Sequence, residues 1–146
     1  MTYVGDGPKK DELEVLVQES GLKDNVWFYG PCYEEKQIAQ IIYNADLCVS
    51  PGDVGLTAMH AMTFGTPVVS HNNFCHQMPE FEAIENGKTG FFFKENDVES
   101  LAECIRAWLT SGLNREQVRQ NCYDVIDQKY NPHFQVEMIR KVIFKD

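Results

Sequence analysis

The chain has 146 residues, of which 43% are hydrophobic and 24% are charged, and its formal net charge at pH 7 is −9. This length and composition fit one globular domain with a real hydrophobic core. The acidic balance argues against partners that are held by clustered basic residues, so we expect no nucleic acid and no docking of this chain on an anionic membrane. A nucleotide remains compatible, because helix N-termini and backbone amides bind phosphate without net positive charge.

Nothing in the sequence directs the chain out of the cytoplasm. No apolar run approaches the roughly 20 residues that span a bilayer, and the N-terminal MTYVGDGPKK has no apolar signal-peptide core. We therefore expect a cytoplasmic protein without a membrane span. The five cysteines are widely spaced and form no CxxC pair, which predicts reduced thiols. Cys48, Cys104 and Cys122 fall in strand or helix patterns and are expected to be small core residues.

Strand and helix patterns alternate along the chain, and Gly or Pro separates many of them. The expected strands cover residues 1–5, 25–30, 46–51, 66–71 and 89–93. The expected helices cover residues 9–20, 34–44, 55–64, 97–108, 115–129 and 133–144, with Asn96 or Asp97 capping the fourth. This alternation predicts an α/β fold, a Rossmann-like doubly wound parallel sheet with helices on both faces. We expect residues 1–146 to form a single domain.

Ligands of such sheets bind beyond the carboxyl ends of the strands. The loops expected along that edge are residues 5–8, 29–34, 50–55 and 71–80. In the last of these, His71, Cys75 and His76 are metal-ligand types. Three soft ligands without a fourth make a weak site, so we predict no metal.

The turn at Ser50–Gly55 joins an apolar strand to a short helix. Gly52 and Gly55 lack side chains, so a ligand can approach the backbone closely. The first amides of the helix, near Leu56 and Thr57, have no intrahelical acceptor and lie at the positive end of the helix dipole. This pattern favours a diphosphate site to which Thr57 adds a hydroxyl. The alternative is a plain glycine-containing connection.

Several segments resemble, in order and spacing, the C-terminal half of the family 4, or group 1, glycosyltransferases. They are VGDGPKKDELEVLVQESGLKDNVWFYG, IIYNADLCVSP, GLTAMHAMTFGTPVVSH, PEFEAIENGKTGFFF and DVESLAECI. The resemblance implies one half of a GT-B fold and retaining transfer of a sugar from a nucleoside diphosphate sugar to an acceptor, typically in cell-surface polysaccharide biosynthesis. It implies no cofactor besides this donor substrate. It also implies an N-terminal acceptor domain, absent from this chain together with a first strand, that reaches the inner face of the membrane.

The resemblance also assigns residues to the donor site. The implied donor-binding residues are Gly5, Gly7, Tyr29, Gly30, Gly52, Gly55, Leu56, Thr57, His60 and Glu80. The family usually has two glutamates separated by seven residues, and these positions hold Gly52 and His60 here. Asp53 is the candidate to replace the first carboxylate, and His60 is the candidate to contact a ribose hydroxyl. We treat both as candidate catalytic residues; the alternative for His60 is a core or capping histidine.

Two other interpretations stay open. Loss of both glutamates is compatible with a non-catalytic nucleotide-sugar-binding or interaction domain. A flavodoxin-like domain is disfavoured because its phosphate loop is absent. The family's basic residues on the leaving phosphates lie upstream of the VGDGP stretch, so we expect the isolated chain to bind nucleotide weakly and to transfer nothing. Phe134, Met138 and Ile143 on the last helix are expected either to pack on this domain or to meet the N-terminal half.

Overall fold

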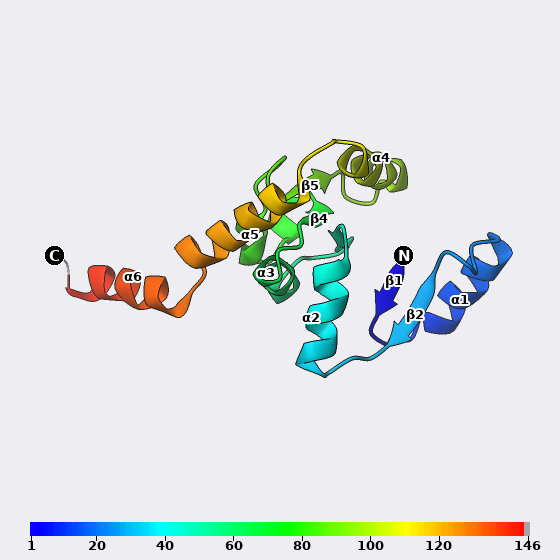
Figure 1. The fold of residues 1–146 in the computed structure, drawn as a ribbon, viewed down its shortest axis with the longest axis horizontal. Coiled ribbons are helices and arrows are strands. Elements are labelled where there is room, and N and C mark those ends of the chain that lie inside the picture. The colour runs from blue at the N-terminus through cyan, green and yellow to red at the C-terminus, as the bar shows by residue number, and fades with distance from the viewer. Residues whose placement is uncertain (145–146) are drawn as a thin grey trace. The chain divides into compact units, whose positions relative to one another are not determined.

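The computed structural model describes residues 1–144, which are drawn as a ribbon in Figure 1. Helices alternate with parallel strands, so the predicted α/β class is confirmed. By its internal contacts the chain divides into two compact units, Met1–Gln40 and the part that begins at Ile41.

The first unit contains a two-stranded parallel sheet. Its elements are β1 (Thr2–Val4), α1 (Lys10–Glu19), β2 (Trp27–Gly30) and the start of α2 (Glu35–Asn44). Thr2 pairs with Trp27, and the rings of Tyr3 and Phe28 stack with centroids 5.2 Å apart. None of residues 1–40 is buried. Two strands and one helix supply too little apolar area to enclose a core.

The second unit contains the core of the protein. Its elements are the end of α2, β3 (Cys48–Val49), α3 (Leu56–Thr63), β4 (Val68–His71), η1 (Phe74–His76), η2 (Pro79–Ala83), β5 (Gly90–Phe93), α4 (Val98–Leu109), α5 (Arg115–Lys129) and α6 (Pro132–Phe144). The strand order is β3-β4-β5, all parallel, so β4 is central. The loop expected at 71–80 contains the two short 3₁₀ turns η1 and η2.

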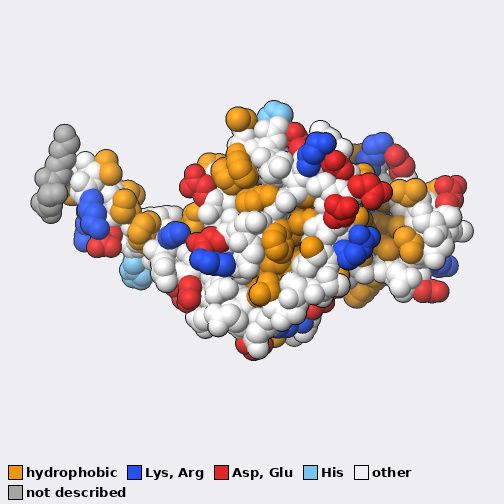
Figure 2. Space-filling model, turned by 90° about the horizontal axis from the view of Figure 1, so that it is seen from above, with side chains coloured by type: hydrophobic (Ala, Val, Ile, Leu, Met, Phe, Trp, Pro, Cys, Tyr) orange, Lys and Arg blue, Asp and Glu red, His pale blue; other side chains and the backbone are white. Residues whose placement is uncertain are grey.

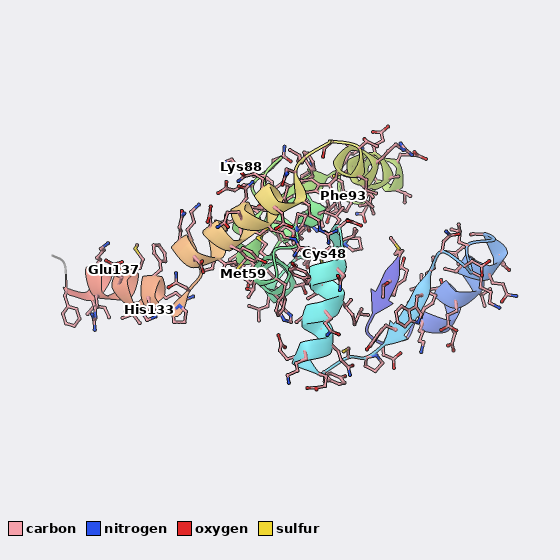
Figure 3. All side chains as sticks on the ribbon, in the orientation of Figure 1. Cys48, Met59, Lys88, Phe93, His133 and Glu137 are labelled. Carbon is pink, nitrogen blue, oxygen red and sulfur yellow. The ribbon has the colours of Figure 1, made fainter. Side chains whose placement is uncertain are left out.

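The buried side chains come mainly from α3, β4 and α5. Met62, Val68 and Cys122 are fully buried, and Trp108 of α4 packs edge-on against Phe91 of β5 at 5.3 Å. Burial raises the pKa of the Cys122 thiol to about 12, which makes it a small apolar core residue as expected. Cys48 (labelled in Figure 3) and Cys104 are half-buried.

The end of α2 is held by two arginines of α5. Arg119 donates to the Tyr43 carbonyl oxygen at 2.7 Å, and its guanidinium carbon lies 3.6 Å from the centre of the Tyr43 ring. Arg115 donates to Asp46 at 2.9 Å. Because the last carbonyls of a helix lack intrahelical donors, these contacts both satisfy α2 and fix the start of β3.

The last helix exposes apolar side chains. No residue of α6 is buried, and Figure 2 shows hydrophobic side chains along it beside the grey terminal atoms. Its exposed large apolar residues are Val136, Met138, Ile139, Val142, Ile143 and Phe144. Phe134, also expected here, is half-buried. No helix among residues 1–144 has the length and apolar content that crossing a bilayer requires.

The pairing of β4 with β5 depends on Gly90, because a Cβ there would lie 1.8 Å from the Val68 carbonyl oxygen. Gly90→Ala should therefore force the strands apart and lower the free energy of unfolding by about 3 kcal/mol or more. Urea unfolding followed by Trp108 fluorescence in a Trp27→Phe background reports this unit alone. Gly52→Ala, which has open space and an ordinary φ, should change stability by less than about 1 kcal/mol. Equal stability of the two variants would contradict the prediction.

Candidate functional site

The turn between β3 and α3 is held by one buried residue and one side-chain amide. Val54 is fully buried in the core, whereas the two residues before it, Gly52 and Asp53, are exposed. The Val54 N–H donates to Gln77 Oε1 at 2.6 Å. The apolar anchor and this hydrogen bond fix the turn, so the backbone that follows enters α3 in one conformation.

The N-terminus of α3 is open. Gly55 is the N-cap residue, and its carbonyl accepts from the Ala58 N–H at 2.9 Å. The N–H groups of Gly55, Leu56 and Thr57 donate to no acceptor within residues 1–144. Leu56 and Thr57 are exposed, and the Met78 side chain lies beside Gly55 at an ordinary contact distance. The predicted phosphate site thus has available amides at the positive end of a helix.

One face of α3 brings together three of the predicted donor residues, Leu56, Thr57 and His60. Thr57 and His60 are three positions apart, so they are neighbours on the helix surface. They line a shallow hollow with Leu56, Thr63 and Met59, the last labelled in Figure 3. The His60 ring is half-buried and lies 5.3 Å from the Phe64 ring. The arrangement fits a ligand that continues from the helix start along this face.

Asp53 lies beside the end of β4. Its Oδ1 is 3.5 Å from Nε2 of His71, whose side chain is 2% exposed. Gln77 donates through Nε2 to Ser70 Oγ at 2.8 Å and to the His71 carbonyl oxygen at 2.9 Å. Gln77 therefore joins the turn before α3 to the carboxyl end of β4.

A second polar cluster lies at the end of β5, after Phe93 (labelled in Figure 3). Asn73 donates to Glu95 Oε2 at 2.7 Å, and His76 Nδ1 lies 3.0 Å from Glu95 Oε1. The hydrogen bond and the charge of Glu95 raise the pKa of His76. The hydrogen bonds from Asn73 and His76 lower the pKa of Glu95.

The remaining residues of this loop do not assemble a metal site. Cys75 is exposed, His71 faces Asp53 and His76 faces Glu95. Across residues 1–144, no three His, Cys, Asp or Glu side chains are grouped to hold an ion. Glu80 is the second residue of η2, and one of its carboxylate oxygens is buried without a hydrogen-bond partner in the described part of the chain. The pKa of Tyr130 is raised, first by burial and then by the nearby charges of Glu82 and Glu80.

The other predicted donor residues lie in the first unit. The Gly5 N–H donates to the Gly30 carbonyl oxygen at 2.8 Å, and both glycines have positive φ, 134° and 83°. Gly7 is exposed nearby in sequence. The Tyr29 hydroxyl donates to Gln37 at 3.0 Å, and its ring packs edge-on against Trp27. That these residues share a donor site with α3 stays a prediction.

Gln77 and Glu95 were not identified as site residues from the sequence. Gln77 contacts a turn 23 positions earlier, and no local pattern marks such a contact. Glu95 follows the last strand, and its position beyond a strand end is the one signal that favours it. His71 carries a similar signal, since it is a polar residue at the end of a buried strand.

Comparisons with known proteins identify a family. The family model described as glycosyl transferases group 1 matches residues 1–125. Alpha-D-kanosaminyltransferase of Streptomyces kanamyceticus is 28% identical over 131 residues, 87% of this chain and 32% of that protein. The exopolysaccharide phosphotransferase of Streptomyces coelicolor is 33% identical over 105 residues, 69% of this chain and 10% of that protein. The chain thus spans between a tenth and a third of these two relatives.

Solved structures share the fold. The crystal structure of Anabaena HepE in complex with UDP has a TM-score of 0.77 at 22% identity, over 99% of this chain and 40% of that chain. Another structure of HepE contains UDP-glucose. The structural neighbours are GT-B glycosyltransferases, in agreement with the fold that the sequence predicted.

The contact between His76 and Glu95 should stabilise the loop formed by residues 72–77 only over a limited range of pH. The pKa of His76 is raised, so its contribution is fully present below its ordinary value of about 6.5 and is lost as the pH rises through the folded value. The pKa of Glu95 is lowered, so its contribution disappears only as the pH falls through that lowered value. Hydrogen exchange of these amides, corrected for intrinsic rates, should be slowest in mildly acidic solution.

His76→Gln is the control for this window. It keeps a donor to Glu95 but does not titrate, so protection of the loop should stay constant between about pH 6 and pH 8. If hydrogen-exchange protection of the wild-type loop is equally constant between about pH 6 and pH 8, His76 does not stabilise the loop through Glu95.

Proposed function

The chain belongs to the group 1 glycosyl transferase family, and we propose that it is the donor-binding half of a retaining glycosyltransferase with the GT-B fold. The donor is a nucleoside diphosphate sugar. The observation that supports this function is the open N-terminus of α3, where the N–H groups of Gly55, Leu56 and Thr57 have no acceptor in residues 1–144. Backbone amides and a helix dipole bind a diphosphate without a basic side chain.

The same amides favour departure of the diphosphate. Negative charge develops on the leaving phosphate as the bond to the sugar breaks, and oriented N–H groups stabilise that charge without reorganising. The Thr57 hydroxyl adds one further donor. The HepE complexes with UDP and UDP-glucose support a uridine nucleotide as the first donor to test.

The sugar and the ribose are assigned to the two side chains that replace the usual glutamates. Asp53 is exposed beside the diphosphate turn, so its carboxylate accepts hydrogen bonds from sugar hydroxyls. His60 lies one helical turn after Thr57 and contacts the ribose hydroxyls. Gly5, Gly7, Tyr29, Gly30 and Glu80 are proposed to complete the donor site.

The acceptor half lies outside the part of the enzyme that this chain represents. This proposal is supported by the 40% of HepE and the 32% of alpha-D-kanosaminyltransferase that the chain covers. A role in surface polysaccharide synthesis is supported by the similarity to an exopolysaccharide enzyme. We place the reaction in the cytoplasm, with the acceptor half at the inner face of the membrane.

A non-catalytic nucleotide-sugar-binding domain is the second candidate. Gly52 and His60 at the two glutamate positions favour it. A transfer assay on the full-length enzyme, with the anomeric configuration of the product read by NMR, separates the candidates. Transfer with the anomeric configuration kept supports the retaining enzyme, and donor binding without transfer supports the second candidate.

Thr57→Val should weaken UDP binding to the chain about tenfold, because it removes one hydrogen bond to a charged phosphate. Calorimetry or NMR titration at high protein concentration with UDP and GDP measures this. Thr110→Val is the matched control: Thr110 caps the C-terminus of α4, far along the sequence from the turn, and its hydroxyl donates to the Arg106 carbonyl oxygen. Absence of binding by every nucleotide tested would refute the donor site.

A further inference from the structure

His71 is a buried imidazole whose outer nitrogen faces one carboxylate. It ends the central strand β4 and is 1% exposed. Its Nε2 lies 3.5 Å from Asp53 Oδ1. A buried polar atom needs a partner, and Asp53 is the group in place to serve as one.

The tautomer of His71 follows from the hydrogen bond that its inner nitrogen, Nδ1, accepts. The Asn73 N–H donates to Nδ1 at 3.3 Å. A nitrogen that accepts from an amide carries no proton, so the proton of the neutral ring lies on Nε2 and points toward Asp53. The separation of 3.5 Å is longer than an ordinary N–H···O hydrogen bond, so the two groups are in close approach without a formed hydrogen bond.

The two residues are held at this separation by Gln77. Its side-chain amide accepts from the Val54 N–H, next to Asp53, and donates to the His71 carbonyl oxygen. Ser70 Oγ, which receives the other Gln77 hydrogen, also lies 3.4 Å from the Gly52 carbonyl oxygen. Gln77 and Ser70 thus join the backbone of the turn to the backbone of β4 on both sides of the contact between Asp53 and His71. The Asp53 side chain is 57% exposed, so it reaches solvent as well as His71.

We propose that His71 is a positioning residue, which holds the Asp53 carboxylate so that its remaining oxygen lone pairs accept hydrogen bonds from hydroxyls of the donor sugar. This inference rests on the proposed donor site. It explains how a shorter carboxylate, one position after the usual glutamate, is restrained in a turn whose other exposed members are Pro51 and Gly52. Asp53 alone would rotate in solvent and lose side-chain entropy on binding.

The test compares a nucleotide with its sugar conjugates on the chain. Wild-type affinities are measured by calorimetry for UDP, UDP-glucose, UDP-galactose, UDP-N-acetylglucosamine, GDP and GDP-mannose. At least one conjugate should bind more tightly than its nucleotide, and His71→Phe should reduce that advantage about fivefold while leaving the affinity for the nucleotide unchanged. Asp53→Ala should remove the same advantage, and the double variant should lose no more than Asp53→Ala alone.

His71→Gln separates positioning from packing. The Gln amide offers an N–H donor toward Asp53, so it should recover most of the sugar-dependent affinity, whereas a purely structural role predicts the same loss as for His71→Phe. The tautomer is read independently of any nucleotide by two-bond ¹H–¹⁵N NMR correlation of the ring. A proton on Nδ1 would overturn the inference even if His71→Phe fails to fold.

The outcomes distinguish the inference from the function on which it rests. Nucleotide binding with no effect of His71→Phe on the sugar-dependent affinity overturns the role of His71 and leaves the donor site standing. Nucleotide binding with no sugar-dependent advantage in the wild type also overturns it. Failure of every nucleotide to bind removes the donor site, and the role of His71 with it.

Discussion

The candidate site depends on the side-chain amide of Gln77. It accepts from the Val54 N–H and donates to β4 through Ser70 and His71, so one planar group fixes the turn against the central strand. Burial of Val54 supplies the apolar part of the same constraint. With the turn fixed, the first amides of α3 are held open and Asp53 is held beside His71. Without it, an exposed stretch containing Pro51, Gly52 and Asp53 would have little to order it.

The chain and its proposed diphosphate ligand carry charge of the same sign, and the local geometry offsets this repulsion. The formal net charge is −9, yet the amides at the start of α3 present partial positive charge within hydrogen-bond reach. Screening at physiological ionic strength weakens repulsion from exposed carboxylates that lie farther away than about 8 Å. The carboxylates at the strand ends are themselves compensated: Asp53 faces His71, and Glu95 is bonded by Asn73 and His76. Weak rather than absent nucleotide binding by this chain is the physical expectation.

The elements of the fold were predictable because their signals are local. The helix expected at 115–129 coincides with α5, and Asp97, one of two proposed caps, accepts from the Ser100 N–H. Helical periodicity and a capping side chain need only one turn of sequence to be recognised. The parallel pairing followed from alternation of strands and helices. The division into two compact units was not anticipated, because it depends on how contacts are distributed and not on any single segment.

The site was predictable only where it lies on one segment. Gly52, Gly55 and Thr57 are successive features of a strand–turn–helix pattern, and the structure has Gly52 in the turn and Gly55 and Thr57 at the open start of the helix. The contact of His71 with Asp53 joins residues 18 positions apart, from the ends of two different strands. Only the register of β3 against β4, with Cys48 opposite Val68, brings these two strand ends together. Spacing along the chain does not reveal such a pair.

The two replaced glutamates have different physical consequences. At position 60, a carboxylate that only accepts hydrogen bonds is replaced by an imidazole that accepts at one nitrogen and donates at the other. A ribose diol can satisfy either side chain, so recognition of the nucleotide is compatible with this change. At position 52 the side chain is lost, and the nearest carboxylate, on Asp53, is one methylene shorter and displaced by one residue. That change requires a second group to set the direction of the carboxylate, and the buried His71 is the side chain that the fold places there. In the proposed donor site, the departure from the family pattern therefore affects the contacts to the sugar more than the contacts to the diphosphate, which we assign to the backbone.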